Sequence, residues 1–145
     1  GVERLVFSDA RLALDTSFTG HAGITAMTLG AVFGAESVRA RPDYAGIGLA
    51  LLDGGMSPLA LMQLALDARL GAGAGARAVV DLVYENLVGA APSASEEAYY
   101  VGLIDSQAFT AAGLALQASA TSLNIDHIGL LGVGGLAETG LPFVG

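Results

Sequence analysis

The feature that most constrains this chain is a near-repeat with a period of about fifty residues. The segment AVFGAESVRARPD in the first half resembles LVYENLVGAAPS in the second, and the two segments place Pro42 and Pro92 in register. Repeats of this length are usually supersecondary units that stack because neither can bury its apolar face alone. The sequence therefore predicts a duplicated, stacked architecture before it indicates any chemistry.

The register of the repeat continues past the prolines with a drift of two residues. LLDGGMSP, which begins at Leu51, matches LIDSQAFT, which begins at Leu103, so Asp53 is paired with Asp105. The shared residues are those that typically start and end helices. We therefore expect the duplication to be clearest at helix caps and turns.

Helix signals recur along the chain. Ser57 precedes Pro58, a good first helical residue, and Gly71 follows Leu70, so residues 58–70 are predicted to form a helix. Its predicted buried face consists of Leu59, Met62, Leu66 and Leu70.

Further helices are predicted at residues 23–33, 44–52 and 77–87, and Ser93 with Glu96 matches the reciprocal capping pattern of another. A last helix is expected from Asn124 to Thr139 on its capping signals, and a broken helix or a loop is the alternative because of four glycines within it.

These signals predict a mainly all-α fold in a single domain that covers residues 1–145. Two short runs rich in Val, Leu and Phe suggest a β-hairpin over residues 1–16. Helical unit 1 then covers residues 17–70 and helical unit 2 covers residues 77–145, with about three helices in each. The Gly/Ala segment 71–76 is expected to be the connector between them.

Composition argues against several functions. The net charge is −8, there is no lysine, and all six arginines precede residue 78, so we expect no nucleic-acid partner. Without lysine or cysteine the chain has no Schiff-base chemistry, no thiolate nucleophile and no thiolate zinc site. The longest uncharged stretch, Ser106 to Ile125, contains polar side chains throughout, so no membrane span is expected.

The N-terminal VERLVFSDARLALD, the proline-containing turns and the helix ends LLDGGMS and LIDSQAFT together resemble a known family. It is an uncharacterised helical repeat domain, a domain of unknown function that is phycobilisome-linker-like and occurs in RTX-type, type I secreted bacterial surface proteins. The resemblance covers residues 2–143. The family usually has a bulky aromatic in its middle helix, where this chain has Tyr99 and Tyr100 in the second unit and Ile47 and Leu49 in the first. The first unit is therefore a degenerate copy.

The resemblance implies an extracellular or cell-surface location in a Gram-negative bacterium, in an S-layer-like or biofilm protein. Its partners would be other copies of itself, other surface-protein modules or surface polysaccharide. We expect no cofactor. Calcium is the one alternative, but no RTX nonapeptide occurs in this chain, so no motif supports it and it is not carried over from that neighbour. The tail without basic residues fits a type I secretion signal, and the general Ala and Gly bias explains it as well.

Four residues are candidates for ligand binding: Tyr99, Tyr100, Asp53 and Asp105. Adjacent helical tyrosines point in different directions, so one should be exposed, where it could contact a glycan; a helix–helix contact is the alternative. The recurring aspartates fit a metal or glycan site. They also fit simple turns, because aspartate bonds its own backbone.

No catalytic set is expected. His21 and His127 have only Asp126 as a local acidic neighbour, and adjacent helical residues point about 100° apart. No nucleophile elbow is present, and capping explains the paired Glu96 and Glu97 without two-carboxylate catalysis.

The first functional hypothesis is a non-catalytic structural or adhesion module that mediates self-association or cell-surface attachment. One alternative is an anchor that binds glycan or lipopolysaccharide. The other is a small hydrolase that uses His127 with Asp126 or Asp105.

Overall fold

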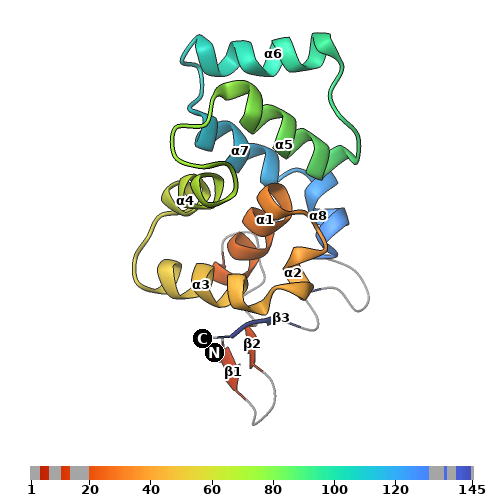
Figure 1. Ribbon diagram of the computed structural model, residues 1–145. Coiled ribbons are helices and arrows are strands. Elements are labelled where there is room, and N and C mark those ends of the chain that lie inside the picture. The colour runs from red at the N-terminus through yellow and green to blue at the C-terminus, as the bar shows by residue number, and fades with distance from the viewer. Residues whose placement is uncertain (1–3, 7–10, 14–19, 131–135, 137–139, 145) are drawn as a thin grey trace.

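The chain is mainly helical. The computed structural model describes residues 4–6, 11–13, 20–130, 136 and 140–144, and these form eight helices and three short strands (Figure 1). The expected mainly all-α fold class is confirmed. The strands lie at one end of the molecule, and the helix Ala94–Asp105, named α6, lies at the other end (Figure 1).

Four helices make up the first half: α1 (His21–Phe33), α2 (Ser37–Ala40), α3 (Pro42–Asp53) and α4 (Pro58–Leu70). The second half contains α5 (Ala76–Val88), α6, α7 (Ala111–Ser119) and α8 (Ser122–Ile128). Two pairs of counterparts have equal lengths, because α1 and α5 have 13 residues each and α3 and α6 have 12, whereas α4 has 13 and α7 has nine. The lengths agree with the duplication, which stays a prediction. The helices α2 and α7 were not among the predicted helices, whereas α8 overlaps the start of the helix predicted from Asn124.

Side-chain caps start helices where the sequence places them. The hydroxyl of Ser57 accepts the backbone N–H of Ala60 at 3.1 Å, and α4 covers the predicted residues. Ser93 and Glu96 form the predicted capping box, with both bonds at 3.2 Å. Thr110 caps α7 in the same way as Ser57 caps α4.

Helix α1 lies at the centre of the fold. Ten of its 13 residues are buried, and it contacts α3, α4, α5, α7 and α8. A helix that is apolar all round is stable in water only when other elements enclose it. Because α1 packs against both halves, the two halves share one core.

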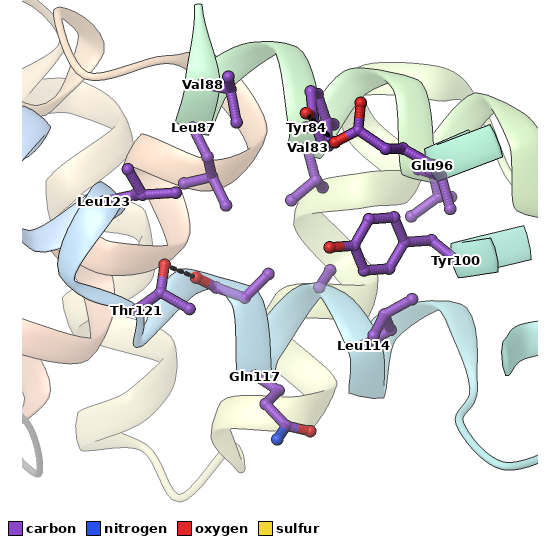
Figure 2. Close-up of a pocket in the computed structure, with 14 residues that line it drawn as sticks. Val83, Tyr84, Leu87, Val88, Glu96, Tyr100, Leu114, Gln117, Thr121 and Leu123 are labelled. Carbon is purple, nitrogen blue, oxygen red and sulfur yellow. Dashed lines mark hydrogen bonds between the residues drawn. The ribbon is translucent and has the colours of Figure 1, made fainter. Parts of the chain in front are cut away.

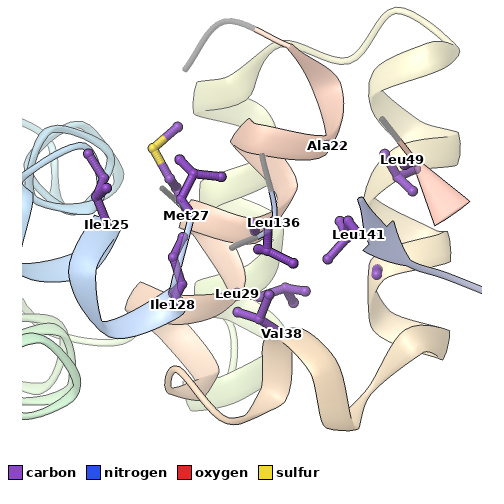
Figure 3. Packing of buried hydrophobic residues seen from close by; sticks show 13 residues of the cluster. Ala22, Met27, Leu29, Val38, Leu49, Ile125, Ile128, Leu136 and Leu141 are labelled. Atoms are coloured by element: carbon purple, nitrogen blue, oxygen red, sulfur yellow. The ribbon is translucent and has the colours of Figure 1, made fainter. Parts of the chain in front are cut away.

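Two apolar clusters flank α1. One joins α1 to α2, α3, α8 and the C-terminal strand β3 (Leu141–Pro142), and includes Leu29, Val38, Leu49, Ile128 and Leu141 (Figure 3). The other joins α1 to α4, α5 and α7, and includes Val32, Met62, Leu66, Val83 and Ala115.

A buried amide fixes α8 to α1. The side-chain nitrogen of Asn124 donates to the carbonyls of Met27 at 2.9 Å and Ser119 at 2.7 Å. Gly30 makes room for this contact, since a methyl group there would overlap both Asn124 and Ile128. A helix of the second half therefore closes the core of the first.

The three strands form an antiparallel sheet in the order β1–β2–β3. β1 (Arg4–Val6) pairs with β2 (Arg11–Ala13), and β2 pairs with β3. Residues 7–10 lie outside the described residues, so the hairpin predicted over residues 1–16 stays a prediction. Pairing with β3 was not expected.

Beyond β3, the C-terminal segment lies on α3. The N–H of Val144 donates to the carbonyl of Pro42 at 2.8 Å, and Gly46 lets the segment lie directly on the helix.

The last predicted helix differs from the observed one. α8 begins at Ser122 and ends at Ile128, with Gly129 as its C-cap, whereas the predicted helix continued to Thr139. Gly129 has φ 66° and ψ 42°, the left-handed conformation that stops helices. Residues 131–135 and 137–139 lie outside the described residues.

The buried face of α4 is also partly mispredicted. Leu59 is 45% exposed, whereas Leu61 is buried beside Met62 and Leu66. The covered face is set by α1 and α7, which contact α4 from two directions.

Within the described residues, no helix is long and apolar enough to cross a membrane.

Candidate functional site

The two predicted tyrosines lie next to each other on α6 and point differently. Tyr99 is 64% exposed, whereas Tyr100 turns towards α5 and α7 (Figure 2). Their rings are 5.2 Å apart and stand edge to face at 76°. Rings in this arrangement do not make one flat platform for a sugar.

Tyr100 lines an apolar groove of about 430 Å³ between α5, α6 and α7, which we call the α5–α7 groove (Figure 2). Its floor is formed by residues of α5: Val79, Val80, Val83, Tyr84, Leu87 and Val88. Leu114 and Ala118 line it from α7, and Leu123 lies at the end away from Tyr100 (Figure 2). The volume is in the range of ordinary ligand sites.

The groove is open because α6 stands away from the rest of the fold. None of the residues of α6 is buried, and its main contact is with α5. The Tyr100 ring lies 6.3 Å from that of Tyr84, between the two helices. The Tyr100 ring therefore fills space between α5 and α6, and we call it the spacer of this helix pair.

A hydrogen bond links α6 to the floor of the groove. The hydroxyl of Tyr84 donates to Oε2 of Glu96 at 2.5 Å, and Oε1 of Glu96 accepts the N–H of Ser93. The bond from Tyr84, followed by those from Ser93, lowers the pKa of Glu96, and the same carboxylate raises the pKa of Tyr84. Glu96 is therefore an anion at neutral pH at the end of an apolar groove.

A second polar contact lies beside the groove. Arg77 of α5 pairs with Glu97 of α6 at 2.9 Å. The nearby Asp81 carboxyl raises the pKa of Glu97, because one of two adjacent carboxyls must carry a proton to bond the other. Oδ1 of Asp81 is buried and has no hydrogen-bond partner. The contact of α6 with α5 therefore includes an ion pair and a carboxyl pair as well as the rings of Tyr84 and Tyr100.

The two predicted aspartates do not share a site. Oδ1 of Asp53 lies 2.6 Å from Nδ1 of His21, which joins the end of α3 to the start of α1. Asp105 ends α6, at the other end of the molecule (Figure 1). Gly54 and Ser106, which follow the aspartates, have nearly the same backbone angles, φ −80° and −78° with ψ −2° in both. Equivalent turns account for this recurrence.

The described residues show no arrangement that supports the remaining catalytic and metal hypotheses. In the described part of the chain, no three His, Asp or Glu side chains are grouped so that they could hold a metal ion. Asp126 is exposed, and the side chain of His127 lies outside the description. The hydrolase that would use His127 stays a prediction.

A smaller groove of about 180 Å³ lies between α1, α3 and α4 in the first half. Nine of its twelve lining positions have an equivalent among the residues of the α5–α7 groove, offset by 51 residues in α1 and α5, 52 in α3 and α6, and 53 in α4 and α7. Three of these pairs are Phe33 with Tyr84, Tyr44 with Glu96, and Gly48 with Tyr100. The correspondence supports the predicted duplication.

No known family, curated protein or solved structure matches this chain. The resemblance to the secreted repeat domain therefore stays an expectation, and the geometry of the chain has to carry the functional argument.

Most of the groove was missed at the sequence level. Val83 and Leu87 lie in the helix predicted at residues 77–87, which was not predicted to line a groove, and Glu96 was expected only as a cap. A signal was available in the repeat, because Glu96 replaces the aromatic Tyr44 and Tyr100 replaces Gly48. Changes of that kind within a repeat indicate where one copy has a different role.

Proposed function

We propose that this chain is a non-catalytic interaction module that binds another protein module in the α5–α7 groove. The observation that carries the proposal is the groove itself, whose rim residues Val88 and Leu123 are 43% and 50% exposed. Open apolar grooves between helices commonly seat an amphipathic segment of a partner. The proposed setting is a large secreted bacterial surface or matrix protein, as the sequence resemblance implies.

Attachment to a different module is favoured over self-association through this groove. Residues 78–145 contain seven Asp and Glu residues and no Lys or Arg. Two copies that met at this surface would bring two acidic halves together, which like-charge repulsion disfavours. The glycan alternative is less favoured by the lining, which offers few polar groups, among them Glu96, Gln117 and Thr121.

The test is a selection of displayed random helical peptides against the full chain, followed by calorimetric titration of the selected peptides. We expect binders whose affinity falls at least tenfold in the double variant Val88→Ser, Leu123→Ser, because both substitutions remove apolar contact at the rim. The control is Ile47→Ser, which changes another exposed apolar residue, in the first half. Binders that lose no affinity in the double variant, or the absence of any binder, would contradict the proposal.

A further inference from the structure

The chemistry at one end of the α5–α7 groove is specific. The Glu96 carboxylate accepts a hydrogen bond from the hydroxyl of Tyr84, whose ring lies 6.3 Å from that of Tyr100, and Tyr99 lies against Tyr100. A carboxylate next to aromatic faces attracts a cation through both its charge and the ring quadrupoles. Among the described residues no cation lies on Glu96, and the only arginine of the second half, Arg77, is paired with Glu97.

The first half shows what occupies the equivalent place there. The guanidinium of Arg41 lies 3.8 Å from the centre of the Tyr44 ring and bonds Asp43 at 2.8 and 3.1 Å. Tyr44 in turn packs on Phe33, with ring centres 5.0 Å apart. In this half the chain therefore supplies its own cation to the aromatic cluster.

The second half lacks that cation. Ser93 stands where the repeat register places Arg41, and no lysine or arginine follows Arg77. At the same place the cluster has gained a charge, since Glu96 replaces Tyr44. An anionic and aromatic cluster without a cation of its own is complementary to a cation from outside.

The shape of the groove indicates the rest of the occupant. Its floor runs from Val79 to Val88 along α5, about 14 Å at the rise of a helix, which matches two to three turns of an amphipathic helix. Apolar side chains on one face of such a helix would cover the valines and leucines of the floor. Basic side chains on its flanks would face Glu96 and the other carboxylates of the acidic half.

We propose that the α5–α7 groove binds a basic amphipathic helical segment of the partner, with one Lys or Arg placed against the Glu96 carboxylate and the neighbouring ring of Tyr100. The inference rests on the proposed function and names the chemistry of its partner. Tyr84 and Glu96 are already joined by a hydrogen bond, so the anionic end of the site is formed before the ligand arrives.

The test uses two synthetic peptides of about fourteen residues with the same leucine stripe, one with lysine and arginine at the other positions and one with glutamate. Each is titrated into the full chain by calorimetry at low and at physiological salt. We expect the basic peptide to bind at least tenfold more tightly than the acidic one, and salt to reduce the difference.

A matched pair of variants locates the cation. Glu96→Gln keeps the capping box, because glutamine can also bond the N-cap, and removes only the charge. It should weaken the basic peptide about threefold to tenfold and leave the acidic peptide unchanged or slightly tighter. Glu85→Gln removes the same charge from an exposed position of α5 that does not line the groove, and it should change the affinity less than twofold.

The outcomes separate the two proposals. If both peptides bind equally and Glu96→Gln has no effect, the proposal of a basic partner is wrong, whereas the proposal of an interaction module is still supported. If Glu85→Gln weakens binding as much as Glu96→Gln does, the attraction is a general effect of the acidic half and the cation site is wrong. If neither peptide binds and the library selection also fails, the interaction module falls as well.

Discussion

Nine positions that line the groove of the first half have an equivalent in the α5–α7 groove, yet the first half is closed and the second is open. In the first half α3 contacts both α1 and α4, buries five of its residues and leaves a groove of about 180 Å³. In the second half α6 buries none and leaves about 430 Å³. Gly48 and Tyr100 hold the equivalent position, and a Cβ at Gly48 would lie 2.8 Å from the side chain of Thr25. The position held by Gly48 and Tyr100 is thus one place where the closed and the open half differ.

The largest effect on stability is expected when the tyrosine of the second half is placed at the equivalent position of the first half, Gly48. Gly48→Tyr forces a ring into the contact between α3 and α1, so the free energy of unfolding should fall by about 3 kcal/mol or more in urea denaturation. The control is Gly102→Ala on α6, where a Cβ meets no atom and helix propensity should improve stability slightly. A stable Gly48→Tyr variant would mean that close packing of α3 does not depend on glycine.

The next effect tests whether the halves are independent. Asn124→Ala leaves the carbonyls of Met27 and Ser119 without their buried amide donor, which should cost about 2 kcal/mol. Because α8 closes the core of the first half, we expect one cooperative transition at a lower urea concentration. Two separate transitions, monitored by amide exchange in each half, would contradict the shared core.

A third change removes the tyrosine ring from the open half. Tyr100→Ala removes the spacer of the open half, so α6 should move towards α5 and the basic peptide should bind at least tenfold more weakly. The unfolding free energy should change by only about 1 kcal/mol, since Tyr100 is half-buried. Tyr99→Ala is the neighbouring control, with a smaller loss expected because its ring is mainly exposed. Full binding by the Tyr100 variant would show that the ring neither spaces the groove nor contacts the ligand.

The smallest effect concerns pH. Asp81 raises the pKa of Glu97 in the folded protein above the usual 4.5. The protonated Glu97 therefore stabilises the fold fully below pH 4.5, and this stabilisation is lost as the pH rises through the raised pKa. Glu97→Gln stays uncharged, and it should raise the melting temperature at pH 7 but not at pH 4. Glu85→Gln serves again as the control. A gain of equal size at both pH values would exclude the carboxyl pair as the cause.

Local signals predicted much of the fold. Ser57 with Pro58, and Ser93 with Glu96, set helix starts through bonds that span three or four residues, so the sequence alone predicts them. Gly129 was harder, because glycine serves both close helix packing and left-handed stops, and only the neighbouring chain decides between them.

The site was less predictable than the helices. Tyr100 was a candidate from the sequence, but its role as a spacer depends on the distance between α5 and α6. Leu59 and Leu61 differ in burial because α4 is covered from two directions, and periodicity contains no information about which directions these are. The burial of Leu59 and Leu61 therefore depends on the tertiary contacts of α4, which the helix pattern does not predict.

The distribution of tyrosines has a practical consequence. The chain has no tryptophan and four tyrosines, and three of them, Tyr84, Tyr99 and Tyr100, gather where α5 meets α6. Intrinsic ultraviolet emission of the unlabelled protein therefore comes largely from the neighbourhood of the groove. Ligand binding or movement of α6 can be followed optically without attaching a dye, and Tyr44→Phe would remove the one emitter that belongs to the closed half.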